Sequence, residues 1–131
     1  MIVVLDASAG IEIGLGRENS QRYREIVKQA STVISSALYK AEVANVLWKY
    51  VKAKLLSKDV ALQRLQYCTD LIDEFVDIGN NNQESFLESI RIDLSVYDML
   101  YLTLARRNGA LLITQDKRLT EKAKELGIEV V

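Results

Sequence analysis

Continuous apolar runs alternate along this chain with longer segments in which apolar residues recur every three to four positions. The runs IVVL at 2–5 and LLIT at 111–114 have the pattern of strands that are buried on both faces of a parallel sheet. Further strands are predicted at 33–34, 75–78 and 128–131. Strands that alternate with helices favour an α/β sandwich with a mostly parallel sheet, and residues 1–131 are expected to form one domain.

Helical periodicity fills most of the segments between these runs. We predict a short helix weakened by glycines at 7–16, and others at 20–30, 37–55, after Ser57, and at 84–90, 95–107 and 117–127. The long helix is expected to turn inward Val43, Ala44, Leu47, Trp48, Val51 and Leu55. The helix after Ser57 is expected to turn inward Val60, Leu62, Leu65, Leu71 and Ile72. A turn is predicted at 80–82.

Composition narrows the possible chemistry. The chain has no His, and its one cysteine, Cys68, excludes an internal disulfide and a zinc site. Without His there is no Ser–His or Cys–His nucleophile pair, so catalysis would use carboxylates, hydroxyls, amines and bound ions. The net charge of −1 gives no overall basic footprint for nucleic acid. No apolar run approaches the about 18 residues of a membrane span, and no signal peptide is recognised, so we expect a cytoplasmic protein.

One carboxylate stands out inside an apolar helix. Asp98 shares a helical face with Leu102 and Ala105, and the other faces of that helix are apolar as well. An ionised carboxylate on a buried face is costly unless a partner stabilises its charge. In a chain without His, that partner is a Lys or Arg, a set of backbone donors, or a metal ion.

Three other acids are placed to meet Asp98. Asp6 and Asp116 follow the apolar strands at 2–5 and 111–114, so both lie at the carboxyl end of the sheet, where ligands bind in open parallel sheets. Glu42 and Asp98 lie near the starts of helices that leave the same end. Four converging carboxylates repel one another unless divalent cations lie between them. Oxygen ligands select Mg²⁺ or Mn²⁺, and such a site suits metal-assisted phosphodiester hydrolysis.

Structural roles are also open for each of these acids. Asp6 and Asp116 both stand where a helix N-cap is expected, and Asp98 lies at capping-box spacing from Ser95. Glu42 has the position of an ordinary helix-flank acid that pairs with Lys49. Fourteen other acids are left out of the set, and the strongest alternatives among them are Glu12, Asp77 and Asp93.

Four segments together resemble the PIN-domain family. They are the first strand, which ends in Asp6 with Ser8 behind it, then SSALYKAEVANVLWK with Glu42 and Asn45, SVYDMLYLTLA with Asp98, and LLITQDKRL with Thr114 and Asp116. Their order and spacing match across essentially the whole chain. The resemblance is especially to the small single-domain toxins of the VapC type.

This resemblance implies a five-stranded parallel sheet and a Mg²⁺- or Mn²⁺-dependent endoribonuclease. It assigns metal binding and catalysis to Asp6, Glu42, Asp98 and Asp116. Ser8 and Thr114 would hydrogen-bond these carboxylates or a metal-bound water, and Asn45 would support the site. It also implies a homodimer and a small antitoxin that wraps the protein and obstructs the acidic groove.

One position departs from the family pattern. Some relatives carry a further acid two residues after the last motif Asp, where this chain has Arg118, so both one-metal and two-metal sites stay open. We expect a metal-bound water to attack phosphorus in line, leaving 5′-phosphate and 3′-hydroxyl ends. The candidates for contacts with the RNA backbone are Lys40, Lys49, Arg106, Lys117 and Arg118.

Other classes fit less well. A phosphoacceptor receiver domain has no place for the helical Asp98, and a haloacid-dehalogenase-type phosphatase requires a second Asp where this chain has Ser8. A PIN nuclease of ribosomal RNA processing or RNA decay remains an alternative. So does a PIN-like module that binds RNA or protein without cleaving it.

Overall fold

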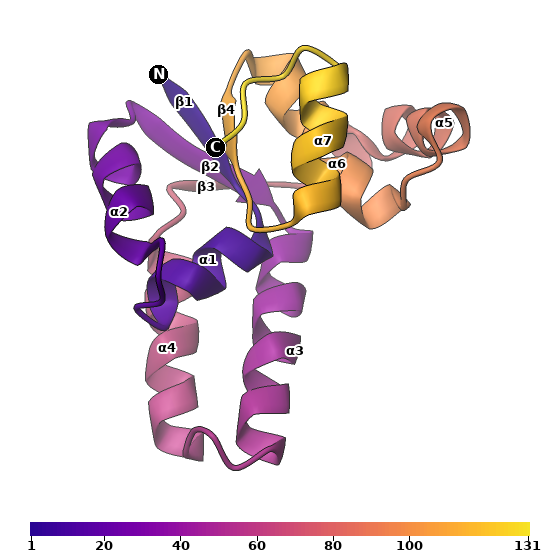
Figure 1. The fold of residues 1–131 in the computed structure, drawn as a ribbon. Coiled ribbons are helices and arrows are strands. Elements are labelled where there is room, and N and C mark those ends of the chain that lie inside the picture. Colours follow the sequence, from indigo (N-terminus) through magenta and orange to yellow (C-terminus); the bar gives the residue numbers. More distant parts are fainter.

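A sheet of four parallel strands forms the centre of the computed structural model, which describes residues 1–131 (Figure 1). In spatial order the strands are β3 (Glu74–Val76), β2 (Thr32–Ser36), β1 (Ile2–Leu5) and β4 (Leu111–Ile113). All neighbouring pairs are parallel. The side chains of Val3–Leu5 in β1 and of Leu111–Ile113 in β4 are buried, as continuous apolar runs predict. The predicted α/β sandwich with a parallel sheet is confirmed.

The fifth strand of the prediction is wrong, although its chain segment lies where the strand was expected. Residues 128–131 run parallel to β4 but form only one isolated bridge, between Val130 and Leu112. Backbone hydrogen bonds join Leu112 to Glu129 and Val131, and the chain ends at Val131. The segment follows a turn at Gly127, which has a φ of +71°, and its backbone bonds to β4 and the residue after it involve only Leu112 and Thr114.

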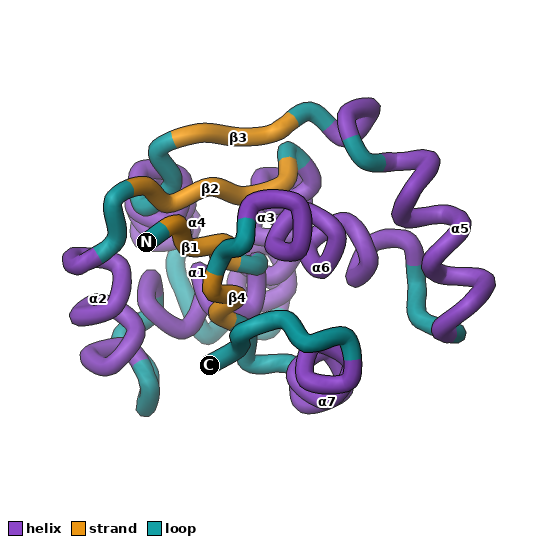
Figure 2. The backbone as a smooth tube through the Cα atoms, turned by 90° about the horizontal axis from the view of Figure 1, so that it is seen from above, coloured by secondary structure: helices purple, strands orange, loops and turns teal.

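Seven helices surround the sheet. They are α1 (Ala7–Gly14), α2 (Ser20–Gln29), α3 (Leu38–Lys52), α4 (Lys58–Asp70), α5 (Asn82–Ile92), α6 (Val96–Asn108) and α7 (Lys117–Glu125). Helix α6 packs on β1, β2 and β4, which explains why its residues 99–105 are all buried. Seen from above, α2 and α5 lie at opposite sides of the strands (Figure 2). None of the helices combines the length and the apolarity that a membrane crossing requires.

Some boundaries differ from the prediction. The strand expected at 75–78 ends at Val76 because the carboxylate of Asp77 accepts a hydrogen bond from Gly79 N (3.2 Å) and starts a 3₁₀ turn at Ile78–Asn80. Helix α5 therefore begins at Asn82, inside the predicted turn. Helix α3 ends at Lys52 instead of Leu55, and Lys54 has a φ of +61° that no α-helix continues through.

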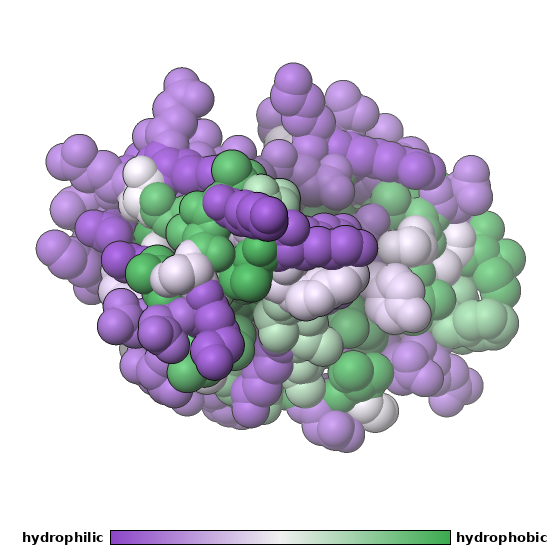
Figure 3. Space-filling view, turned by 90° about the horizontal axis from the view of Figure 1, so that it is seen from below, coloured by the Kyte–Doolittle hydropathy of each residue, from purple (hydrophilic) through white to green (hydrophobic).

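Helices α3 and α4 form a hairpin that extends beyond the sheet (Figure 1). Val43 and Leu47 are buried as predicted, but Trp48, Leu55, Val60 and Leu62 are exposed, which corrects their predicted inward position. The sheet does not reach this part of the hairpin, so one side of each helix has no layer to pack against. An apolar groove of about 400 Å³ results, lined by Ala44, Leu47, Trp48, Val51, Lys58, Ala61, Leu62 and Leu65. Apolar side chains gather over this hairpin in the view from below (Figure 3).

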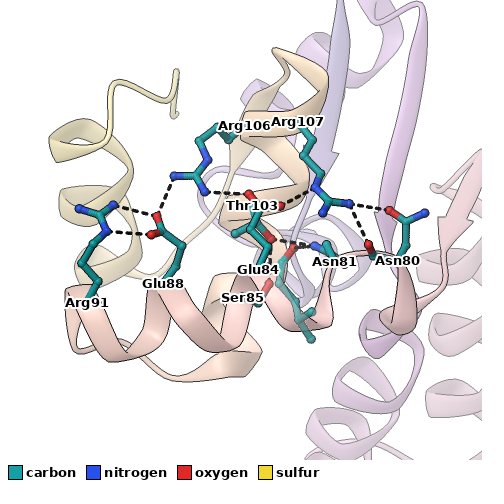
Figure 4. A network of polar contacts seen from close by, with 10 residues as sticks. Asn80, Asn81, Glu84, Ser85, Glu88, Arg91, Thr103, Arg106 and Arg107 are labelled. Atoms are coloured by element: carbon teal, nitrogen blue, oxygen red, sulfur yellow. Dashed lines mark hydrogen bonds and ion pairs between the residues drawn. The ribbon is translucent and has the colours of Figure 1, made fainter.

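A polar network attaches α5 to α6 (Figure 4). Its buried part joins Asn81 and Ser85 to the hydroxyl of Thr103, each at 2.8 Å. Its exposed part consists of ion pairs between the acids of α5 and the arginines of both helices, namely Glu84, Glu88, Arg91, Arg106 and Arg107. This network places the side chain of Arg106 against α5.

Candidate active site

The register of the sheet brings the two ends of the chain together. Leu5 of β1 pairs with Ile113 of β4, so the next residues, Asp6 and Thr114, become neighbours at the carboxyl edge of the sheet. The Thr114 hydroxyl donates a short hydrogen bond to Asp6 Oδ2. The Ser8 hydroxyl donates to Asp6 Oδ1 at 2.7 Å and accepts from Gln115 N at 2.9 Å. Both hydroxyls singled out in the sequence therefore contact the first carboxylate.

Asp6 and Asp116 also cap helices, so the structural role considered for each is present. Asp6 Oδ1 accepts from Ala9 N (2.9 Å) at the start of α1. Asp116 Oδ1 accepts from Arg118 N (2.9 Å) and Leu119 N (3.1 Å) at the start of α7. Because capping uses one oxygen of Asp116, the other is left for a second role.

Two helices supply the remaining acids. Glu42 lies in α3, and its Oε1 accepts a 2.6 Å hydrogen bond from the buried Tyr101 hydroxyl. Asp98 lies half-buried in the first turn of α6, where Ser95 is the N-cap and its hydroxyl accepts from Asp98 N at 3.2 Å. Ser95 is thus the N-cap, as its spacing from Asp98 predicts, and the Asp98 side chain is among those that line the pocket described next.

All four acids line one pocket of about 300 Å³. Ser8, Asn45, Lys49 and Tyr101 are also among its lining residues. The sequence argument placed the four acids at the same edge of the sheet, because two follow strands and two lie near helix starts. Their presence in one pocket agrees with that argument.

The pocket is an unfavourable place for uncompensated negative charge. Burial raises the pKa of Asp6 to about 6, against the hydrogen bonds from Thr114 and Ser8. Burial also raises the pKa of Glu42, and the nearby Asp98 carboxylate raises it further. Burial likewise raises the pKa of Asp98, and the Asp116 carboxylate adds to this effect. A bound cation would relieve both effects because it favours the charged form of each acid.

The donor set fits a hard divalent ion. The pocket offers carboxylate, hydroxyl and amide oxygens, the ligand types that Mg²⁺ and Mn²⁺ prefer. No three of the chain's acids are grouped tightly enough to coordinate one ion through direct bonds. Mg²⁺ usually keeps several of its waters and binds proteins through one or two carboxylates, so it does not require such a group.

The basic residues divide into two groups. Lys49 lines the pocket, and Lys117 and Arg118 directly follow Asp116 in the first turn of α7, with Arg118 donating to the Asp93 carbonyl at 2.7 Å. Of the five candidates only Lys49 is among the lining residues, and the other two candidates contact residues away from the pocket. Lys40 lies over the ring of Phe75, and Arg106 pairs with Glu84 and Glu88 (Figure 4).

The three alternative acids have structural roles. Glu12 is buried and accepts from Asn19 N at 2.9 Å, and Asp77 starts the 3₁₀ turn. Asp93 ends α5 in a left-handed conformation with a φ of +61°. Tyr101 also lines the pocket, although the sequence argument gave it no role, because it lies in a helix whose faces are otherwise apolar.

The pocket can be compared with known proteins. Ribonuclease VapC3 from Pyrobaculum aerophilum is 30% identical to this chain over 127 residues, covering 93% of this chain and 95% of that protein. The solved structure of PAE2754 from Pyrobaculum aerophilum has a TM-score of 0.75 at 26% identity, covering 100% of this chain and 90% of that chain. The solved structure of VapBC2 from Rickettsia felis, bound to a DNA fragment of the VapBC2 promoter, has a TM-score of 0.70 at 18% identity. The match covers 100% of this chain and 98% of that chain.

A family model agrees with these similarities. The model of the PIN domain matches residues 3–125, a range that contains all four pocket acids. The chain therefore belongs to the PIN-domain family and resembles the VapC-type ribonucleases within it.

Proposed function

We propose that this protein is an endoribonuclease that requires Mg²⁺ or Mn²⁺ and hydrolyses RNA phosphodiester bonds. The observation that carries the proposal is the meeting of four acids in one pocket, although they are far apart in the sequence. Glu42 and Asp98 come from α3 and α6, and Asp6 and Asp116 from the loops after β1 and β4. The similarity to a protein named as a ribonuclease supports RNA as the substrate.

The side chains of the pocket have distinct proposed roles. The four acids would hold one or two ions, and Ser8 and Thr114 fix the Asp6 carboxylate in place. A bound divalent ion would lower the pKa of water and neutralise charge on the phosphate oxygens. Asn45, one turn after Glu42 on α3, offers an amide to the same space.

Contacts with the RNA backbone are proposed for the basic residues at the pocket. Lys49 lines the pocket, and Lys117 and Arg118 follow Asp116 at the start of α7, so these three residues are the candidates for contacts with phosphates. Arg118 stands where some relatives have a further acid, so its positive charge favours substrate binding over a second ion.

Cleavage of a single-stranded RNA by the purified protein tests this function. We expect fragments with 5′-phosphate and 3′-hydroxyl ends when Mn²⁺ or Mg²⁺ is present, and none after addition of EDTA. Cleavage that persists in EDTA would contradict the metal requirement. Stoichiometric RNA binding without cleavage in Mn²⁺ would favour the non-catalytic alternative.

We also propose a small antitoxin as the partner of this chain. The apolar groove between α3 and α4 exposes Trp48, Leu62 and their neighbours, and exposed apolar patches of this kind mark interaction sites. The solved VapBC2 pair from Rickettsia felis shares this fold, which supports a two-protein assembly. An amphipathic helix of the antitoxin is the occupant that such a groove fits.

Trp48→Asp is expected to weaken binding of the antitoxin by about 30-fold, because truncation of a central interface aromatic costs about 2 kcal/mol or more. Trp48 is 56% exposed, so the melting temperature should change little. The change is measured by calorimetric titration with the separately purified protein that is encoded by the reading frame next to the gene of this chain. Phe86→Asp, at a 54% exposed position on α5, is the matched control. Equal weakening by both variants would rule out the groove as the docking surface.

A further inference from the structure

Tyr101 connects the core of the protein to the acidic pocket. It lies in α6, three residues after Asp98, and its side chain is 2% exposed. The ring belongs to the hydrophobic core, whereas the hydroxyl reaches the pocket wall and donates to Glu42 Oε1 at 2.6 Å. Packing therefore fixes the position of the donor before any ligand binds.

The four pocket acids differ in how they are held. Asp6 accepts hydrogen bonds from the Ser8 and Thr114 hydroxyls and from Ala9 N, and Asp116 accepts from two backbone N–H groups of α7. The Glu42 carboxylate has only the bond from Tyr101. Glu42 is also the longest of these side chains, so it has the most rotamer freedom to lose when it binds a ligand.

The bond also links two elements across the pocket. Glu42 comes from α3 and Tyr101 from α6, the helix that supplies Asp98. One helix thus provides one carboxylate directly and fixes the position of a second. A displacement of α6 relative to α3 would change the spacing of both acids.

We infer that Tyr101 is a positioning residue, whose hydroxyl holds the Glu42 carboxylate in the orientation that binds the divalent ion. Since Glu42 is a metal ligand only under the proposed function, this inference rests on that function. Groups that orient metal ligands commonly change metal affinity by about 10- to 100-fold when they are removed.

The competing explanation is that Tyr101 only satisfies its own buried hydroxyl. Tyr39 serves as a control within the same chain, because it is also fully buried and its hydroxyl donates at 2.6 Å to the Cys68 carbonyl. Cys68 is not a pocket residue. Tyr101→Phe and Tyr39→Phe each remove one buried hydroxyl of the same kind. Only the first removes a bond to a pocket acid.

Direct titration of the two variants with Mn²⁺ by calorimetry tests the inference. Tyr101→Phe should bind Mn²⁺ about tenfold more weakly than wild type. Tyr39→Phe should bind with wild-type affinity, even if both variants melt at lower temperatures. Equal affinity of Tyr101→Phe and wild type, or equal weakening by both variants, would overturn the positioning role.

A second background shows whether Tyr101 acts through Glu42. Glu42→Asp keeps the charge but withdraws the carboxylate from the hydroxyl by one methylene, so adding Tyr101→Phe to it should change Mn²⁺ affinity less than about twofold. A tenfold change in both backgrounds would show that Tyr101 does not act through Glu42. If wild type itself binds no Mn²⁺, the proposed metal dependence fails and this inference fails with it. Binding by wild type with no effect of Tyr101→Phe would overturn the inference alone.

Discussion

Asp98→Asn is expected to slow RNA cleavage by about 10²- to 10³-fold, the cost of removing one group that stabilises developing charge. The carboxylate lies in the acidic pocket, but the helix start does not depend on it. The bond between Asp98 N and the Ser95 hydroxyl involves the backbone, so asparagine preserves it. Measurement of kcat/KM on a single-stranded RNA in Mn²⁺, together with the melting temperature, separates lost chemistry from lost folding.

Asp59→Asn is the matched control for this substitution. Asp59 also lies in the first turn of a helix, α4, but it is exposed and outside the pocket. Its replacement by asparagine removes the same charge as Asp98→Asn does. The control should retain wild-type activity. Wild-type kcat/KM in Asp98→Asn would remove Asp98 from the proposed machinery, and equal losses in both variants would point to a general charge effect.

The metal-free protein should lose stability as the pH rises through about 6. Burial raises the pKa of Asp6 from 3.8 to about 6, so the folded state holds this proton more tightly than the unfolded state does. The resulting stabilisation is complete below pH 3.8 and is lost as the pH rises through about 6. The full effect of Asp6 is about 3 kcal/mol, of which roughly 1 kcal/mol falls between pH 5 and pH 7.

Composition makes this effect measurable. The chain has no His, so no side chain with an ordinary pKa titrates between pH 5 and pH 7. The lowered pKa of Glu84 and of Glu88 acts with the opposite sign, but below that window. Burial also raises the pKa of Glu42 and of Asp98, which act in the same direction as Asp6.

Urea unfolding in EDTA at pH 5 and pH 7 tests the role of Asp6. Wild type should be more stable at pH 5, and Asp6→Asn should reduce the difference by roughly 1 kcal/mol because asparagine does not titrate. The same pH dependence in both proteins would show that Asp6 titrates normally. In that case the pocket does not oppose the negative charge of Asp6.

The sequence predicted the meeting of the four acids better than it predicted the outer faces of the helices. Asp6 and Asp116 follow strands, and parallel strands all end at the same edge of a sheet, so their meeting needs no knowledge of strand order. The position of Glu42 on the flank of α3 followed from helical periodicity, and Glu42 lines the pocket with Asn45 and Lys49.

The apolar and polar pattern of the sequence did not predict the side-chain exposures and contacts that depend on how the helices pack in the fold. Trp48 and Leu62 continue an apolar stripe, but periodicity does not show where the supporting sheet ends, and both side chains are exposed on the hairpin. The sequence does not show that Arg106 is paired, and only the packing of α5 on α6 brings Glu84 and Glu88 to it. Tyr101 reads as a core residue, and only the packing of α6 near α3 shows that its hydroxyl reaches Glu42.

A thermal-melt titration with Mn²⁺, on wild type and on Asp98→Asn, tests whether the acidic pocket is a metal site. A ligand that binds only the folded state raises the melting temperature by mass action. The melting temperature of wild type should rise with Mn²⁺, whereas Asp98→Asn should melt higher than wild type without metal and respond little. If neither protein responds to Mn²⁺ and the variant simply melts lower, Asp98 is a structural helix residue and the pocket does not bind the ion.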